Sequence, residues 1–449
     1  MTKNAASRPK ILFVAPAAYP LGGVQVWLNS LLHGLPNFGW ETHLALTEGR
    51  FHDVGAYLAR NPFDATTSIA APTGTRQGRV DAICNTIDAI NPDLVVGVNI
   101  ADVYGAVAQR RSDGATKVKA VATLHGVQAD FLADFRSERS VIDAVVCTNR
   151  LSQRLVVDNA GVDPRRVLYA PYGVTEAQPS DRRRGSRRKD SALTLAYVGR
   201  LEQDQKRIRD LVLIVEAAQK AGLEIDLLVA GDGPDRDMMR NEMAARKLET
   251  SIHFLGALNA AQVVERVYGR CDALIVTSSW ETGPIVAWEA MTQGIPVLTS
   301  AYVGSGAEGA LVDSENCLMF PVGDIAAAVA KLRVLTEPNE GERLGEAGRM
   351  MVARRYTLAK SLEQWDAQLT HVLALPALAP GQRQLTQHGG RLDALLGARF
   401  AEHIRRLLGR SFTHSEPGGE WPHAYGVGAL DKDAFWATAA QLDHAGRQA

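Results

Sequence analysis

The chain has 449 residues, 46% of them hydrophobic and 22% charged, with a formal net charge of −1. This length suits two domains, each with its own hydrophobic core. The near-zero net charge argues against a nucleic-acid-binding protein that is steered by bulk positive charge, so we expect no nucleic-acid partner.

The cysteines, the histidines and the first residues indicate a cytoplasmic protein without a metal. The four cysteines lie far apart, each in or beside an apolar run, and none forms a CxxC pair. We expect buried free thiols in a reducing compartment. The histidines form no HExxH motif or other spaced ligand set, so no metal site is expected. Residues 1–10 are polar, and no apolar run approaches the ~20 residues of a membrane-spanning helix.

The first half of the chain alternates between predicted strands and helices. An apolar run at 11–15 predicts a strand, and the loop after it ends in Gly22-Gly23 before a helix. The paired glycines let the backbone approach a ligand or simply turn the chain, and the residues alone leave both open. The alternation then continues, which predicts parallel βαβ units: strand 41–47, helix 78–91, strand 93–98, helix 102–111, strands 117–123 and 143–147, and helix 149–160.

A single histidine, His125, directly follows the strand predicted at 117–123. A lone histidine at a strand end is more often structural than catalytic. The carboxyl end of a parallel strand is nevertheless where open α/β sheets bind ligands. His125 is therefore a candidate site residue with a structural alternative.

Residues 173–190, GVTEAQPSDRRRGSRRKD, lack apolar periodicity and predict an interdomain linker. The segment carries a basic cluster: Arg182, Arg183, Arg184, Arg187, Arg188 and Lys189. Such a run is usually a solvated loop. The alternative is electrostatic contact with anionic lipid or with a lipid-diphosphate acceptor.

The second half restarts with a strand at 193–198 and another at 225–230, which is followed by Gly231-Asp232-Gly233-Pro234. Arg236 occupies the third glycine position of the dinucleotide fingerprint, which weakens a dehydrogenase interpretation. Asp235-Arg236-Asp237 imitates a metal-binding DxD motif. We interpret these acids instead as first-turn residues of a helix, where the helix dipole favours them.

The stretch from Cys271 to Ser300 carries the strongest chemical signal. A strand at 273–276 ends in small polar residues, and Gly283-Pro284 then open a helix whose free amides can hold a phosphate. Glu289, inside that helix, could bind the hydroxyls of a ribose, and Glu281, at the strand end, could meet a sugar beyond the phosphates. The alternative is an ordinary strand–helix–strand unit with two solvated acids.

Four sequence blocks occur in a fixed order: YVGRLEQDQKR at 197–207, LLVAGDGP at 227–234, HFLGAL at 253–258, and SSWETGPIVAWEAMTQGIPVLTS from 278, in which Glu281 and Glu289 form an E-x7-E pattern. Together they resemble the nucleotide-sugar site of family 4 retaining glycosyltransferases. The resemblance extends over roughly residues 9 to 378 and is strongest from 195 to 325.

This resemblance implies an α/β protein of the GT-B fold, with two Rossmann-like parallel-sheet domains facing a cleft. The implied organisation is an acceptor domain at 1–172, the basic linker at 173–190, and a nucleotide-sugar domain at 191–355. A crossover helix at 356–378 would return to the first domain. Residues 379–449 form an extension of unknown role.

The resemblance also implies roles for individual residues. Lys206 lies one residue further from Arg200 than in the common pattern, and Arg207 stands where glycine is frequent. Pro284 replaces a usual glycine and lacks an N–H. The implied catalytic residues are Glu281 for the sugar, His125 at the mouth of the cleft, and Arg200 and Lys206 for the diphosphate. The implied donor-binding residues are Gly22, Gly23, Gly231, Leu255, Thr282, Gly283, Pro284, Ile285 and Glu289.

The implied function is transfer of a sugar from a nucleotide diphosphate sugar, with a UDP-sugar favoured, to a glycan or lipid-linked acceptor. The resemblance implies retention of configuration, no metal or other cofactor, and a role in polysaccharide or glycoconjugate synthesis. Two alternatives stay open: a GT-B-like epimerase or phosphorylase, and a non-catalytic nucleotide-sugar-binding protein. Peripheral contact with the anionic inner face of a membrane is a further expectation.

Residues 391–410 predict a basic amphipathic helix within the extension. One side would carry Leu392, Leu396, Phe400, Ile404 and Leu407, and arginines fall largely on the other side. Such a helix can lie on a membrane surface, dock a partner, or cover its own protein. The sequence leaves these three open.

Overall fold

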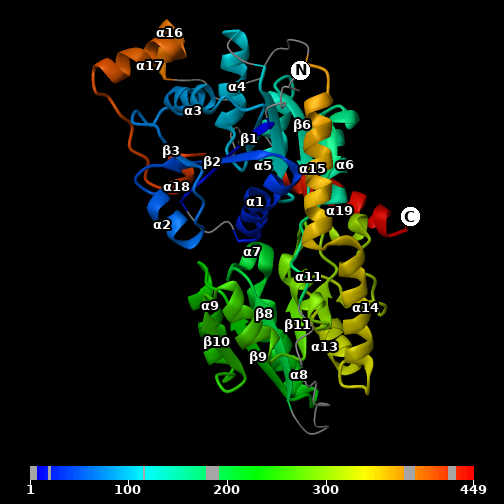
Figure 1. Ribbon diagram of the computed structural model, residues 1–449. Coiled ribbons are helices and arrows are strands. Elements are labelled where there is room, and N and C mark those ends of the chain that lie inside the picture. The colour runs from blue at the N-terminus through cyan, green and yellow to red at the C-terminus, as the bar shows by residue number, and fades with distance from the viewer. Residues whose placement is uncertain are drawn as a thin grey trace. The chain divides into compact units, whose positions relative to one another are not determined.

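A computed structural model describes residues 8–18, 22–114, 117–177, 192–378, 390–422 and 431–448. The protein divides into two compact units (Figure 1), which we describe separately. Unit 1 comprises Met1–Ala170 with Leu362–Ala437, and unit 2 comprises Pro171–Ser361 with Thr438–Ala449. The basic cluster of the predicted linker lies outside the described residues.

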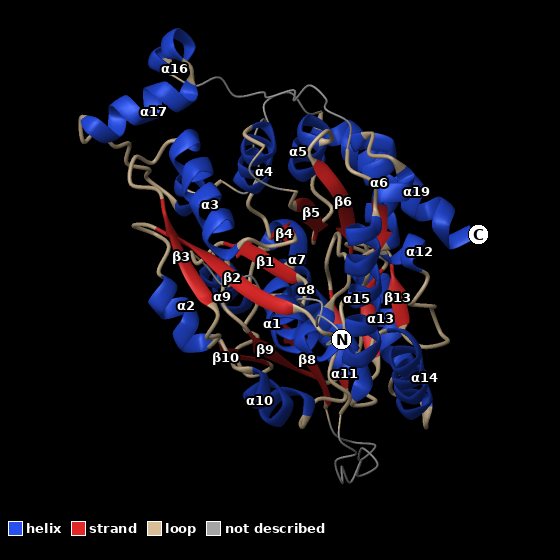
Figure 2. Cartoon of the chain, turned by 45° about the horizontal axis from the view of Figure 1, so that its top comes forward, coloured by secondary structure: helices blue, strands red, loops and turns tan. Residues whose placement is uncertain are grey.

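Within the described residues, unit 1 forms a seven-stranded parallel sheet of order β3-β2-β1-β4-β5-β6-β7. The strands are β1 (Lys10–Ala15), β2 (Glu41–Glu48), β3 (Thr66–Ala70), β4 (Leu94–Gly97), β5 (Lys119–Leu124), β6 (Ile142–Cys147) and β7 (Val167–Tyr169). The helices are α1 (Gly23–Gly34), α2 (Val54–Arg60), α3 (Arg76–Ile90), α4 (Asp102–Ser112), α5 (Ala129–Glu138) and α6 (Arg150–Ala160). In Figure 2, β2 and β3 run between α2 and α3.

The central strands of unit 1 are mainly apolar because helices cover both faces of a parallel sheet, and the one acid in β6, Asp143, accepts a hydrogen bond from the amide of Ala120. Every residue of β4 and β6 is buried. The strands predicted in this half are present, with ends shifted by at most two residues. The sequence did not predict β3, whose residues TTSIA include one buried side chain, or β7, which is three residues long.

Unit 2 forms, over its described residues, a six-stranded parallel sheet of order β10-β9-β8-β11-β12-β13. Its strands are β8 (Leu193–Val198), β9 (Ile225–Ala230), β10 (Ile252–Gly256), β11 (Ala273–Val276), β12 (Val297–Ser300) and β13 (Leu318–Phe320). Its helices are α7 (Gln203–Lys206), α8 (Ile208–Lys220), α9 (Arg236–Ala245), α10 (Ala260–Val263), α11 (Ile285–Thr292), α12 (Ser305–Glu308), α13 (Ile325–Val334) and α14 (Glu340–Arg355). The predicted α/β class with two Rossmann-like parallel sheets is confirmed.

The strand order of unit 2 reverses between β8 and β11. Chain order runs outward from β8 to β9 and β10 on one side, and from β11 to β13 on the other. In open α/β sheets, ligands bind at the carboxyl ends of the strands where such a reversal occurs. The loops after β8 and β11 are therefore the first place to look for a site in this unit.

Two helices carry the chain from one unit to the other. Helix α15 (Leu358–Ala374) begins in unit 2 and ends in unit 1, where the ammonium of Lys119 donates to the carbonyls of Val372 and Leu373 at 2.8 and 2.9 Å. Helix α19 (Lys432–Gln448) ends in unit 2, where Asp443 accepts hydrogen bonds from the amides of Gly306 and Ala307. The C-terminal extension thus contributes to both units.

The helix predicted at 391–410 is broken into two, α16 (Arg391–Leu396) and α17 (Ala398–Leu407). Gly397, between them, has a φ of 78°, which lies in the left-handed region that glycine adopts readily. A short helix, α18 (Pro417–Glu420), follows in unit 1.

Candidate functional site

The loops after β8 and β11 are joined by hydrogen bonds that bring their side chains together. Thr277 follows β11, and its hydroxyl donates to the carbonyl of Lys206 at 2.7 Å. The amide of Ser279 donates to the carbonyl of Gln205 at 2.8 Å. Lys206 ends the short helix α7, so these bonds hold that helix end against the loop that carries Glu281.

Glu281 is 7% exposed and lies at the centre of these contacts. Its Oε1 accepts from Lys206 Nζ at 2.5 Å and from Ser278 Oγ at 2.7 Å. Gln205 Nε2 lies 3.4 Å from the other carboxylate oxygen. A buried carboxylate is costly unless it is paired and hydrogen-bonded. The arrangement therefore gives unit 2 one well-held anion beside one cation at the point where the strand order reverses.

Arg207, directly after Lys206, has left-handed backbone angles, with φ 51° and ψ 48°. That conformation is easy for glycine and less favourable for arginine. The Arg207 guanidinium holds the carboxylate of Asp210 at 2.7 and 3.2 Å. Arg207 thus has a backbone conformation that glycine would favour, and its side chain is held by the ion pair with Asp210.

Arg200 follows β8 but is held differently from Lys206. Its side chain is 62% exposed and pairs with Glu202 at 3.2 Å. The side chain is therefore accessible from solvent. Its predicted role toward a diphosphate stays a prediction.

Gly231 has a packing role between two strand ends. Its φ is 143°, and a Cβ placed there would lie 1.8 Å from the carbonyl oxygen of Gly199. The loops after β8 and β9 therefore meet only because no side chain intervenes. Leu255 lies partly buried on the neighbouring β10. Donor binding by Gly231 and Leu255 stays a prediction.

The sequence predicted that Gly283-Pro284 open a helix. Helix α11 begins one residue after Pro284, at Ile285. Pro284 is the N-cap residue with an extended ψ of 94°, and Gly283 before it has a φ of 135°. Thr282 and Ile285 are buried. The ring of Trp288 stacks on Tyr356 at 4.6 Å between centroids and 5° between planes, which fixes the helix on its own unit.

Glu289 belongs to a separate set of contacts from Glu281. The hydroxyl of Tyr268 donates to Glu289 Oε2 at 2.9 Å. Burial raises the pKa of Glu289, and the hydrogen bond from Tyr268 opposes part of that rise. The two carboxylates of the E-x7-E pattern are thus held by different partners, one by a cation and one by a phenol. Sequence reasoning did not single out Gln205 or Tyr268.

The predicted site residues of the first half lie in unit 1. His125 follows β5, and its ring lies 4.3 Å from that of Trp27 on α1. Burial lowers the pKa of His125 to about 3, so the imidazole is neutral near pH 7. Gly22 precedes α1 with a φ of 57°, and its carbonyl accepts from the amides of Gln25 and Val26. Gly23 is the first residue of that helix.

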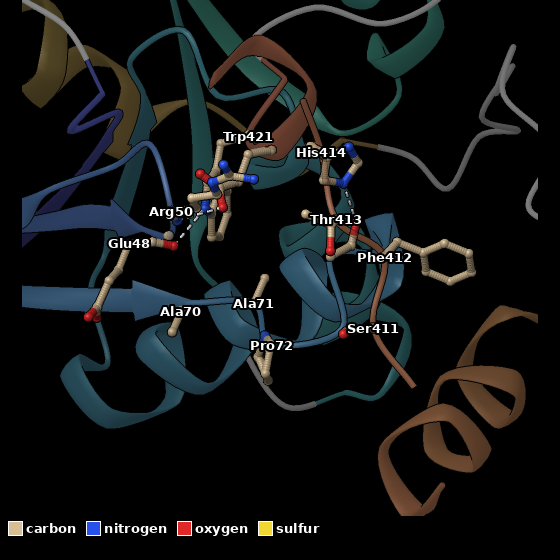
Figure 3. A pocket seen from close by; sticks show the side chains of 13 residues that line it. Glu48, Arg50, Ala70, Ala71, Pro72, Ser411, Phe412, Thr413, His414 and Trp421 are labelled. Atoms are coloured by element: carbon tan, nitrogen blue, oxygen red, sulfur yellow. Dashed lines mark hydrogen bonds between the residues drawn. The ribbon is translucent and has the colours of Figure 1, made fainter. Parts of the chain in front are cut away.

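Unit 1 also contains a cavity of about 400 Å³ at the carboxyl ends of β2 and β3 (Figure 3). The extension forms one wall: Trp421 Nε1 donates to the carbonyl of Glu48 at 3.0 Å, and Glu420 accepts from the amides of Arg50 and Phe51 at 2.7 and 2.9 Å. Its lining mixes charged, polar and aromatic residues: Glu48, Gly49, Arg50, Ala70, Ala71, Pro72, Gly74, Ser411, Phe412, Thr413, His414, Glu420 and Trp421. Sequence reasoning did not predict this cavity, because its walls come from segments far apart in the chain.

A search of the described residues finds no group of three or more histidine, cysteine, aspartate or glutamate side chains that could hold a metal ion. In the same part of the chain, no helix is both long and apolar enough to cross a membrane. Cys84, Cys147 and Cys317 are buried free thiols, whereas Cys271 is only partly buried. Burial raises the pKa of the Cys84 thiol to about 12.

Residues 179–351, within unit 2, match the family of glycosyl transferases group 1. Unit 2 thus contains the part of the chain that is similar to group 1 glycosyl transferases. The glycogen synthase of Mycobacterium tuberculosis is 28% identical to the chain over 156 residues, 34% of this chain and 37% of that protein. The D-inositol 3-phosphate glycosyltransferase of Geodermatophilus obscurus is 29% identical over 237 residues, 47% of this chain and 51% of that protein. The match thus spans about half or less of each of these two relatives.

The solved structures to which the chain is similar include two glycosyltransferase-type proteins of the same fold. The lipopolysaccharide outer core galactosyltransferase WaaB aligns with a TM-score of 0.63 and 18% identity over 81% of this chain and 99% of that one. The Anabaena protein HepE, in complex with UDP-glucose, aligns with a TM-score of 0.64 and 18% identity over the same shares. These likenesses confirm the predicted fold class, with two Rossmann-like parallel-sheet domains.

Proposed function

We propose that the chain transfers a sugar from a nucleotide diphosphate sugar to an acceptor, with retention of configuration. The observation that carries this proposal is the buried Glu281 carboxylate held by Lys206 and Ser278, at the strand reversal of the domain that matches group 1 glycosyl transferases. The solved complex of HepE with UDP-glucose supports a UDP-sugar as donor.

The cations and the carboxylate of this site could stabilise the opposite charges that develop when the bond between the sugar and the diphosphate breaks. As the sugar leaves the phosphate, negative charge grows on the diphosphate and positive charge on the sugar. In the proposal, Lys206 and Arg200 turn to the diphosphate and Glu281 faces the sugar. The backbone N–H groups of Gly283 and Ile285 add hydrogen bonds to the phosphate, whereas Pro284 has no backbone N–H to donate.

The proposed transfer is balanced with the donor and the acceptor as its only reactants. The acceptor hydroxyl gives its oxygen to the new glycosidic bond and its proton to the leaving diphosphate oxygen. The bond between the anomeric carbon and that oxygen breaks, and its electron pair stays with the diphosphate. His125, neutral at pH 7, can accept or donate a hydrogen bond to a sugar hydroxyl without carrying charge.

The acceptor is proposed to be a glycan or lipid-linked molecule used in polysaccharide or glycoconjugate synthesis. We propose that it binds to unit 1, where the cavity beside Arg50 and His414 offers polar groups and aromatic walls at strand ends. A lipid-linked acceptor would bring the protein to a membrane surface.

Donor consumption with and without acceptor tests the proposed reaction. A panel of nucleotide sugars is incubated with the chain, alone and with glycan and lipid extracts, and the released nucleotide is measured. A transferase consumes donor faster with acceptor and forms a larger glycan. Consumption that needs no acceptor and yields an isomerised sugar would indicate an epimerase. Saturable binding with no turnover would indicate a binding protein.

Glu289→Gln should raise the KM for the donor roughly tenfold and change kcat little, because a ribose contact is shared by the ground and transition states. Burial raises the pKa of Glu289, so it takes up a proton at a higher pH than an ordinary glutamate. The KM of the parent enzyme should therefore rise as the pH falls through that raised pKa.

The pH dependence of KM should be lost in Glu289→Gln. Initial rates over a range of donor concentrations and pH values measure both quantities. Glu315→Gln, an exposed glutamate of the same unit, is the matched control and should behave like the parent. A lower kcat with an unchanged KM in Glu289→Gln would contradict a ribose-binding role.

Activity should survive removal of divalent cations, because the proposal assigns charge stabilisation at the diphosphate to Lys206 and Arg200. The measurement is the initial rate after dialysis against EDTA, compared with the same enzyme supplied with Mg²⁺ or Mn²⁺. Loss of turnover with EDTA and its recovery with either cation would contradict the proposed metal-independent mechanism.

A further inference from the structure

Helix α17 packs on unit 1 with its charged side, not its apolar side. Glu402 is 1% exposed, and its two carboxylate oxygens accept from the hydroxyls of Thr73 and Thr75 at 2.7 and 2.6 Å. Arg405, also buried, pairs with Asp393 at 2.5 Å. These polar contacts, together with the small side chain of Ala401, form the inward face of the helix.

Further ion pairs fix the same orientation at both ends of α17. Arg399, in its first turn, holds Asp113 at 2.6 Å, and Arg406, in its last turn, lies 3.1 Å from Asp81 on α3. A helix held at two ends and in the middle by specific charges cannot rotate without breaking several of them. The charged side is thus the one that covers the protein.

The opposite side of α17 presents large apolar side chains to solvent. Phe400 is 56% exposed, Leu407 72% and Leu408 66%. Half of the exposed large hydrophobic residues identified among the described residues fall between 395 and 412: Leu395, Leu396, Phe400, Leu407, Leu408 and Phe412. Exposed apolar side chains that gather in one short segment mark an interaction surface. Figures 1 and 2 show α16 and α17 at the margin of unit 1.

The charges that remain outward on this segment are positive. Its acidic residues, Asp393 and Glu402, are both turned inward and paired, as described above. Arg391, at the start of α16, and Arg410, after α17, are exposed. The outward surface therefore combines protruding apolar side chains with cations and lacks an exposed acid over residues 390–412 of the described chain.

We propose that this α16–α17 surface, formed by Leu395, Phe400, Leu407, Leu408 and Phe412 with Arg391 and Arg410, docks on the surface of an anionic lipid bilayer. Apolar side chains enter the boundary between headgroups and acyl chains, and arginines bind the phosphates of anionic lipids. A symmetric dimer through the same surface would set the arginines of one copy against those of the other, which disfavours a second copy as the occupant. The proposal does not depend on the reaction that the protein catalyses.

Vesicle sedimentation with the whole 449-residue chain tests the proposal. The chain should sediment with vesicles of phosphatidylcholine and phosphatidylglycerol, and far less with phosphatidylcholine alone. Raising the salt concentration should weaken the binding, since screening reduces the attraction of arginine to phosphate. The variant Phe400→Ser/Leu407→Ser/Leu408→Ser should bind anionic vesicles at least about tenfold more weakly, because burying one such side chain is worth about a factor of ten or more.

A matched control separates this surface from exposed apolar residues in general. The variant Val264→Ser/Met350→Ser removes two exposed apolar side chains of unit 2 and should bind vesicles like the parent. Arg391→Gln/Arg410→Gln should reduce the preference for anionic over neutral vesicles. All substituted residues are exposed, and an unchanged circular dichroism melt verifies that each variant is folded.

Three results would overturn the proposal. The first is a parent chain that binds neither kind of vesicle. The second is a triple serine variant that binds anionic vesicles as tightly as the parent. The third is a concentration-dependent dimer, seen by light scattering and abolished by the triple variant, which would assign the surface to a second copy of the chain.

Discussion

Glu281→Gln should lower kcat about 100-fold while leaving the affinity for the free nucleoside diphosphate nearly unchanged. In the proposed reaction, the carboxylate acts where positive charge develops on the sugar, an interaction that is strongest in the transition state. The product nucleotide lacks the sugar, so its binding does not use that contact. Glutamine keeps the shape and the acceptor for Ser278 but loses the charge.

Two measurements on the same protein separate these effects. Initial rates with a confirmed donor give kcat, and calorimetric titration with the nucleoside diphosphate gives the dissociation constant. Glu289→Gln serves as the contrasting variant, because it should change KM and leave kcat nearly intact. A Glu281→Gln enzyme as active as the parent would show that Glu281 has no such role.

Lys206→Met should lower both turnover and stability. Turnover should fall about 100-fold because the cation proposed to stabilise the leaving diphosphate is gone. The free energy of unfolding should fall by about 3 kcal/mol, since Glu281 is left buried without its cation. Urea unfolding followed by circular dichroism measures the second effect.

A double substitution distinguishes the structural and catalytic consequences of losing Lys206. In Lys206→Met/Glu281→Gln no unpaired charge stays buried, so the midpoint of unfolding should return most of the way to that of the parent while activity stays low. Lys220→Met is the matched control. Its ion pair with Glu216 lies at the surface, and its loss should cost less than about 1 kcal/mol. An active double variant would contradict the proposed role of both residues.

The sequence predicted the strands that are buried on both faces, because such strands are mainly apolar runs. The family resemblance implied that Arg200, Lys206 and Glu281 act on one donor, and the loops after residues 198 and 276 that carry them do meet in unit 2. The sequence did not predict that Lys206 would pair with Glu281. The motif gives each residue a role toward a ligand, whereas the pairing depends on the side-chain geometry of two loops that are far apart in sequence.

The orientation of α17 shows a second limit of sequence patterns. Helical periodicity establishes that residues 391–410 have an apolar and a charged side, but it does not say which side covers the protein. Thr73, Thr75 and Asp81 decide that question, and they lie more than 300 residues earlier in the chain. The break at Gly397 was also missed, because a single glycine within a helical pattern is often tolerated.

Retention of configuration is tested most directly by a proton NMR time course of the anomeric signals while the chain acts on an α-configured nucleotide sugar, such as UDP-glucose, and an acceptor extract. We expect the α-anomeric signal of the donor to decline and the first product signal to be again that of an α-linked sugar. With Glu281→Gln, the donor signal should stay constant on the same timescale. A first product with the β configuration, or equal donor loss with Glu281→Gln and the parent chain, would contradict the proposed reaction.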